Sequence, residues 1–133
     1  MSSEEEVRQI NAQILSAASK GDFAPFVAAL DDGVEVFDHV AYLFDGKASF
    51  LEYLQSVGSG AESMTYAFHQ YSCRAFTDTM AVVNAYDRLA TFPKGGGQPK
   101  VQCGRATWVY VKSGRDWKIV TAHFSPLPEG ASS

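Results

Sequence analysis

The sequence predicts an α+β fold, in which helices come first along the chain and an antiparallel sheet comes second. Apolar residues recur at helical spacing up to about residue 57, whereas from Met64 onward their period is two and β-forming residues dominate. Tight, glycine-rich or polar turns divide this second half into four long segments. Helices followed by a strand meander favour a curved sheet wrapped over helices that are grouped on one side.

The first helix is predicted to begin at a capping box and to end at a glycine. Ser3 and Glu6 have the spacing at which each side chain can satisfy a backbone N–H of the first turn. The apolar positions that follow at helical spacing are Val7, Ile10, Ile14, Leu15 and Ala18. Gly21 then stands where a left-handed C-cap is expected.

Two further helices and one short strand are expected before residue 60. Asp22 starts a short helix with Pro25 in its first turn, where the missing N–H costs nothing. A turn at 31–33 leads to a strand over 34–38, and the third helix carries its apolar side between residues 50 and 57. The four long strands are predicted at 64–76, 79–92, 100–112 and 116–125.

Composition limits the functions that need to be considered. The chain has 133 residues, so one domain spanning 1–133 is expected, with a core over about 5–126 and a frayed tail from Pro126. Aromatic residues make up 13%, which suffices for a core, and the net charge of −4 disfavours nucleic-acid binding. No apolar run is long enough for a membrane span, and the polar, acidic N-terminus does not resemble a secretory signal, so a cytoplasmic protein without membrane contact is expected.

The two cysteines do not predict a metal site. Cys73 and Cys103 lie 30 residues apart, without a Cys-x-x-Cys motif or a paired histidine spacing. In a chain without a secretory signal, such thiols are typically small buried hydrophobic groups. We therefore expect no metal and no cofactor.

Turn positions predict which strand residues share a face of the sheet. A turn centred near Gly96 places Asp87 opposite Arg105, and a turn centred on Gly114 places His123 opposite Arg105. One face then carries Asp87, Arg105 and His123 in a row. The other face carries the following residues: Tyr86, Arg88, Trp108, Tyr110, Val120 and Phe124. A single β-bulge would exchange these faces.

The outer face is predicted to pair two subunits. The residues assigned to this interface are Trp117, Ile119, Thr121 and His123. Trp117 and Ile119 would otherwise be large apolar groups in water, which favours burial against a second copy. His123 also fits a cross-strand polar ladder with Arg105, so a purely structural role stays open for it.

Several segments together resemble the nuclear transport factor 2-like superfamily. They are GDFAPF, DDGVEVFD, FDGKASFLEYL, AYDRL and GRDWKIVTAHFS, and their order spans residues 5–126. The superfamily includes SnoaL-like cyclases, ketosteroid isomerases and scytalone dehydratase, and this chain is most similar to the association (hub) domain of calcium/calmodulin-dependent protein kinase II. The resemblance implies a cystatin-like cone, in which the curved antiparallel sheet and the helices enclose a pocket and the outer sheet face pairs subunits.

The resemblance also implies site residues. Arg88 falls on a position where hub domains carry a pocket arginine, whereas Trp108 and Phe124 replace other basic positions. Asp38 stands at the end of the first strand, where ketosteroid isomerases carry their general base, although turn chemistry alone could explain an Asp there. Tyr86, Trp108 and Phe124 are expected to be pocket walls. The available hydroxyl donors are Tyr42, Tyr66 and Tyr86.

Three functions remain open at this stage. The favoured one is a homo-oligomeric pocket protein that binds a small, partly apolar ligand. The second is an isomerase, cyclase or dehydratase that transfers protons with Asp38 as base, because a carboxylate in an apolar cavity has a raised pKa. The third is a pure oligomerisation module. Nucleic-acid or protein transport has little support from the charge.

Overall fold

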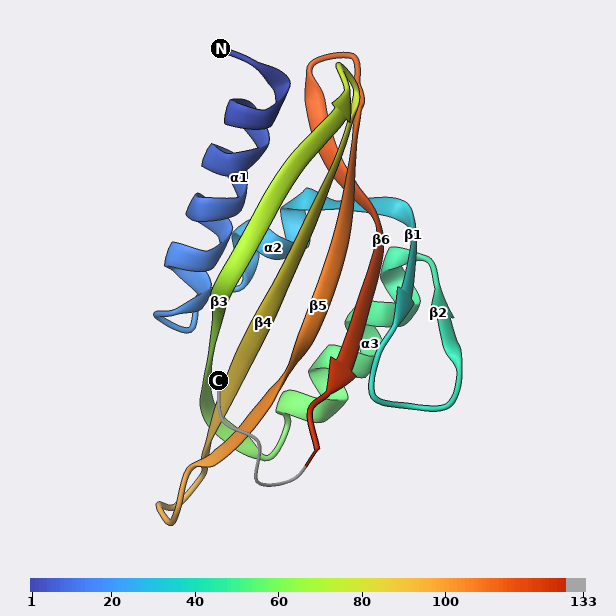
Figure 1. The fold of residues 1–133 in the computed structure, drawn as a ribbon. Coiled ribbons are helices and arrows are strands. Elements are labelled where there is room, and N and C mark those ends of the chain that lie inside the picture. Colours follow the sequence, from blue (N-terminus) through green and yellow to red (C-terminus); the bar gives the residue numbers. More distant parts are fainter. Residues whose placement is uncertain (129–133) are drawn as a thin grey trace.

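The computed structural model describes residues 1–128 and contains three helices and six strands (Figure 1). The elements are α1 (Ser3–Ala18), α2 (Ala24–Ala29), β1 (Leu30–Phe37), β2 (Leu43–Asp45), α3 (Lys47–Gly58), β3 (Ala61–Thr77), β4 (Met80–Pro93), β5 (Lys100–Ser113) and β6 (Asp116–Pro126). This order confirms the predicted α+β class, with helices in the first half and a strand meander in the second.

The N-terminus of α1 differs from the prediction by one residue. Ser2, not Ser3, is the N-cap, and its hydroxyl accepts from the backbone N–H of Glu5 at 3.2 Å and donates to the Glu5 carboxylate at 3.0 Å. A sequence with Ser at both positions and Glu at 4, 5 and 6 contains two overlapping capping patterns, so spacing alone does not decide between them. Gly21 has φ +85, as a left-handed cap requires.

The six strands form one sheet in the order β2-β1-β6-β5-β4-β3. The meander from β3 to β6 is antiparallel, whereas β1 pairs in parallel with β6. Helices α2 and α3 lie behind the curved sheet in Figure 1, and α1 runs along its β3 edge. The sheet therefore has one face turned toward the helices, the concave face, and one face that no helix of residues 1–128 covers, the outer face.

The pairing of β4 with β5 is shifted by one residue from the prediction. Asp87 lies opposite Gly104, and Tyr86 lies opposite Arg105. Since side chains alternate along a strand, this shift turns Asp87 to the concave face and leaves Tyr86 and Arg88 exposed on the outer face. The expectation that Arg88 and Tyr86 line the interior is therefore wrong.

A β-bulge in β6 overturns half of the predicted interface. Val109 pairs with Thr121 and Tyr110 with Ile119, so that Val120 has no partner. Before the bulge, Trp117 and Ile119 turn inward and are only 6% and 0% exposed, which excludes them from an exposed interface. After it, Thr121 and His123 lie on the outer face, as predicted.

The core lies between the helices and the concave face. Its largest fully buried side chains are Trp108, Tyr110, Phe50, Leu30, Ile119, Val7, Val34, Val36 and Val83. The Tyr110 hydroxyl donates to Asn11 Oδ1 at 2.8 Å and so connects the sheet to α1 inside this core. Within residues 1–128, no helix is both long and apolar enough to cross a membrane.

The C-terminal strand is longer than predicted. β6 continues to Pro126, and the N–H of Leu127 still donates to the Cys103 carbonyl at 3.0 Å, so fraying from Pro126 is wrong. The rest of the expected tail, residues 129–133, lies outside the described residues.

Candidate functional site

The candidate site is a group of polar side chains on the concave face, here called the carboxylate cluster: Asp38, His39, Tyr66 and Asp87. β1, β3 and β4 supply them, either from within the strand or directly after it. Of the predicted site residues, Asp38, Trp108 and Phe124 belong to this region. Tyr42 lies in the loop before β2 and is 61% exposed.

Asp38 reaches the interior because of strand alternation. Val34 and Val36 are buried on the concave side of β1, and Asp38 follows at the same two-residue period. Its Oδ1 accepts from the backbone N–H of His39 at 2.7 Å and lies 3.9 Å from the His39 ring nitrogen Nε2. Burial raises the pKa of Asp38, and the hydrogen bond and charge of His39 only partly oppose this.

Asp87 and Tyr66 form the buried centre of the cluster. The Tyr66 hydroxyl donates to Asp87 Oδ2 at 2.5 Å, and Asp87 is only 6% exposed. Burial raises the pKa of Asp87, and the Tyr66 hydrogen bond opposes part of that rise. Burial likewise raises the pKa of Tyr66 well above its ordinary value, so Tyr66 stays protonated as a donor.

The charge of Asp38 acts on Asp87 and on the tyrosine that is bound to Asp87. The negative charge of Asp38 raises the pKa of Asp87 and that of Tyr66, in each case after burial as the larger cause. It also raises the pKa of Tyr53 on α3, again after burial. The cluster is therefore one electrostatically coupled unit rather than two separate acids.

Aromatic rings surround the carboxylate cluster on the concave face. Phe68 packs on Trp108 with ring centroids 4.7 Å apart, and Phe124 lies 6.3 Å from Trp108 and 6.5 Å from Tyr66. Phe124 therefore lies near Tyr66 of the cluster, and Trp108 is in ring contact with Phe124 and Phe68. Apolar walls are the physical cause of the desolvation that raises both carboxyl pKa values.

Gly104 leaves the space that Asp87 occupies. A Cβ at position 104 would lie 2.9 Å from Asp87 Oδ1 and 2.6 Å from the Ser125 carbonyl oxygen. Both distances are shorter than real Cβ contacts, so only glycine fits between β4 and β6 at this point.

Sequence reasoning missed the Tyr66–Asp87 pair. Tyr66 was one of three possible donors, and Asp87 was assigned to the outer face. No local pattern connects two residues on neighbouring strands, because their contact depends on the register between β3 and β4. In that register Phe68 lies opposite Asp87, which brings Tyr66 diagonally next to it.

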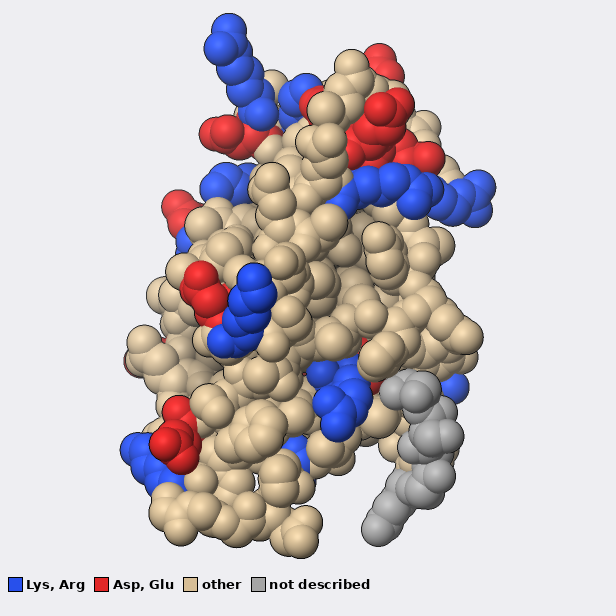
Figure 2. Space-filling view, turned by 90° about the vertical axis from the view of Figure 1, so that its left-hand side faces the viewer, with Lys and Arg blue, Asp and Glu red and all other residues tan. Residues whose placement is uncertain are grey.

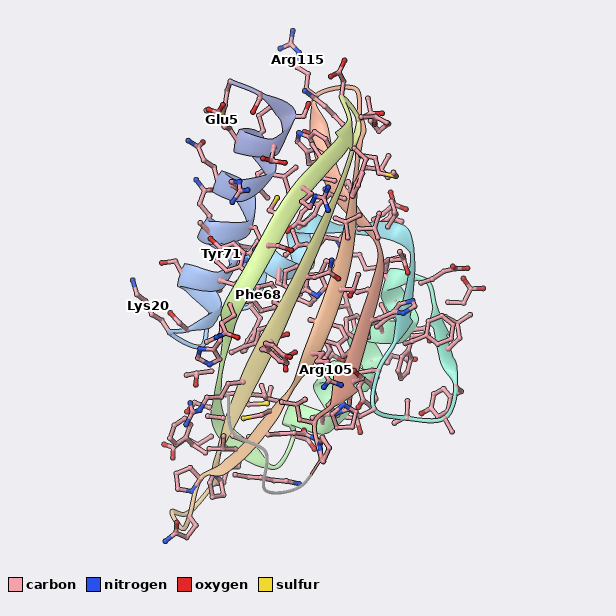
Figure 3. All side chains as sticks on the ribbon, viewed as in Figure 1. Glu5, Lys20, Phe68, Tyr71, Arg105 and Arg115 are labelled. Atoms are coloured by element: carbon pink, nitrogen blue, oxygen red, sulfur yellow. The ribbon has the colours of Figure 1, made fainter. Side chains whose placement is uncertain are left out.

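At least two hollows on the surface of residues 1–128 lie outside the cluster. A groove of about 300 Å³ runs between α1 and β3, and Phe68 and Tyr71 line it from β3 (Figure 3). Figure 2 shows this side of the molecule with a broad uncharged area and charged side chains mostly toward the upper end and the left-hand edge. The groove contains none of the four cluster residues.

The second hollow, of about 490 Å³, lies on the outer face. Phe37, Arg105, Thr107, His123 and Ser125 line it, with parts of Ala106 and Phe124. Phe37 and His123 are in ring contact at 5.0 Å, and Arg105 lies over Tyr86 at 5.8 Å. In Figure 3, Arg105 is on the side of β5 that faces away from α2 and α3.

The cluster has the groups that proton transfer needs. A carboxylate whose pKa is raised by burial is a stronger base than an exposed one, and a protonated tyrosine can stabilise developing negative charge. Among the described residues, no three His, Cys, Asp or Glu side chains are grouped so that they could hold a metal ion.

Solved structures of the same shape include proteins of different functions. A nuclear transport factor 2-like superfamily protein from Salmonella enterica has a TM-score of 0.77 at 17% sequence identity. The aligned region covers 97% of this chain and 94% of the Salmonella chain. The calcium/calmodulin-dependent protein kinase II hub from S. rosetta has a TM-score of 0.73 at 25% identity, covering 93% and 96%. A hexachlorocyclohexane dehydrochlorinase has a TM-score of 0.70 at 12% identity, covering 96% and 90%.

The family is shown by sequence. No curated protein matches this chain. The model of the SnoaL-like domain matches residues 7–129, which is nearly the whole chain. The chain therefore belongs to the SnoaL-like family, and its fold is the one that the nuclear transport factor 2-like protein from Salmonella enterica has.

Proposed function

We propose that this protein binds a small, partly apolar ligand beside the carboxylate cluster and transfers a proton on it. The observation that carries the proposal is the pair of coupled carboxyl groups, Asp38 and Asp87, both raised in pKa and bordered by aromatic rings. Structural carboxylates are usually exposed or paired with a lysine or arginine, whereas Asp87 is buried and is hydrogen-bonded to Tyr66, and Asp38 has only the His39 imidazole near it.

Each residue of the cluster has a distinct role in this proposal. Asp38, at the strand end and in contact with His39, is the general base that takes a proton from the ligand. Tyr66 donates its single hydroxyl proton to Asp87 in the free protein, and turning that proton to the ligand lets it stabilise the negative charge left there. The reaction class is proton abstraction beside an electron-withdrawing group, which leads to isomerisation, cyclisation or elimination.

The test compares two matched variants on one ligand. A thermal-shift screen of aromatic ketones, steroids and short carboxylates identifies a ligand, and NMR in D₂O then follows deuterium incorporation into it. Asp38→Asn should lower the exchange rate by about 10²–10⁴-fold and leave affinity nearly unchanged, because Asn cannot accept the proton. The exposed Asp45→Asn serves as control and should exchange like the unmodified protein.

Two results would contradict the assignment. Full exchange in Asp38→Asn would place the base elsewhere, with His39 as the next candidate. A ligand that binds without any exchange above buffer would make the protein a binder rather than an enzyme.

A second proposal concerns assembly. In the described part of the chain no helix lies over the outer face, which exposes Phe37 and Tyr86 at 47% and 38%. Similarity to a kinase hub domain suggests homo-oligomerisation. We therefore propose that two copies pair through this face, with Thr121 and His123 in the contact and without Trp117 and Ile119.

A further inference from the structure

Within the described residues, no lysine or arginine is a hydrogen-bond or ion-pair partner of the carboxylate cluster, and none acts on the pKa of Asp38 or Asp87. All 11 Lys and Arg residues lie within the described residues 1–128. Three of them have partners elsewhere: Arg8 donates to the Cys73 carbonyl, Lys112 to Glu6, and Lys118 to the Ala28 carbonyl. None of these contacts involves a residue of the cluster.

Arg88 on β4 and Arg105 on β5 lie on the outer face of the sheet, whereas the carboxylate cluster lies on the concave face. Arg88 follows Asp87 directly in β4, and strand alternation turns it to the outer face. Arg105 lies opposite Tyr86 in β5 and stacks over its ring on that same face. The sheet backbone therefore separates both guanidinium groups from the cluster.

The charged groups that act on the cluster are carboxylates and imidazoles. Besides burial and the Tyr66 hydrogen bond, His39, Asp38 and His69 influence the pKa of Asp87. Besides burial, only His39 influences the pKa of Asp38. In the described part of the chain, the cluster thus has two acids and no permanently positive group to balance a further negative charge.

We propose that this site selects its ligand by charge, accepting neutral ring compounds and rejecting carboxylates. The inference rests on the proposed function, because it concerns the ligand of that same site. A bound carboxylate would add a third acidic group beside Asp38 and Asp87, would lose its water, and would gain no cation in return. A neutral carbonyl or amide of the same shape avoids both costs and can still pack against Phe68 and Phe124.

The experiment uses a matched pair of probes, 2-naphthamide and 2-naphthoate, which share a ring system and differ in charge. Isothermal titration with the full chain at neutral pH should give an affinity for the amide at least about tenfold higher, as expected for like charges in a partly buried site. In the Asp38→Asn/Asp87→Asn double variant this preference should shrink to less than about threefold. The control Glu35→Gln removes an exposed charge from β1 and should keep the full preference.

Circular dichroism verifies that the double variant folds, and Asp38→Asn alone, at the end of a strand, gives the same comparison if it does not. Equal affinity for the two probes, or tighter binding of the acid, overturns the inference. The two proposals fail in different experiments. If the protein does not catalyse proton transfer, deuterium exchange is absent, but the titration still gives the preference for the amide.

Discussion

Gly104 and Asp87 face each other across β5 and β4, and the missing side chain of the first makes room for the carboxyl group of the second. A Cβ on Gly104 would stand 2.9 Å from Asp87 Oδ1 and 2.6 Å from the Ser125 carbonyl oxygen. The glycine thus determines how deeply Asp87 lies and how closely β6 approaches β5.

Gly104→Ala should destabilise the protein because the added methyl group overlaps both neighbours. We expect a loss of about 1–3 kcal/mol in the free energy of unfolding, measured with urea, which is the usual cost of overpacking. Gly60→Ala is the matched control, since nothing lies within 4 Å of a Cβ there and its φ is not positive. If both variants were equally stable, the close approach at Gly104 would have no energetic consequence.

The stability of Asp87→Asn relative to the unmodified protein should depend on pH. Burial raises the folded-state pKa of Asp87, so its ionisation opposes folding once the pH exceeds 3.8, its ordinary value. Asn does not ionise, so the free energy of unfolding of the variant should rise relative to that of the unmodified protein as the pH rises from about 4. The difference should become constant above the folded-state pKa of Asp87. The gain is about 1.4 kcal/mol for each pH unit by which that pKa is raised.

Urea unfolding between pH 4 and 7 measures this difference, and Asn at position 87 keeps an oxygen that can accept from Tyr66. The exposed Asp45→Asn should follow the unmodified protein throughout. A stability difference that does not change with pH would mean that Asp87 ionises as easily in the folded chain as in the unfolded one.

Tyr86→Glu should dissociate the proposed dimer. Near a twofold axis the substitution brings like charges together and removes an aromatic contact from the outer face. Analytical ultracentrifugation at micromolar concentration should find a dimer for the unmodified chain and a monomer for the variant. Val57→Glu, on the exposed side of α3, should remain dimeric. A monomeric unmodified protein would refute the proposal.

Local signals explain why the order of elements was predictable from the sequence. Pro25, Gly21 and the acidic first turn of α1 act within a few residues of themselves, and the change from helical to alternating spacing marks the start of the sheet. The resemblance of the ordered segments to the superfamily added the expectation of a cone and of Asp38 at its interior end.

Local sequence signals could not determine which strand side chains lie on which face of the sheet. Side chains alternate with a period of two, so one residue of register between β4 and β5 exchanges Asp87 for Arg88 as the inward side chain. The unpaired Val120 in β6 has the same effect on Trp117 and Ile119. No short-range pattern records these shifts, because they arise where separate strands meet.

The sequence by itself determined the α+β class, the succession of helices and strands, and the place of Asp38 at a strand end. Only the tertiary structure decided that Tyr66 and Asp87 meet, that both carboxyl groups share one environment, and that the arginines face the other way. The physical reason is that helix and turn formation depends on neighbours in sequence. Burial, pKa shifts and charge balance depend instead on contacts between strands that are distant along the chain.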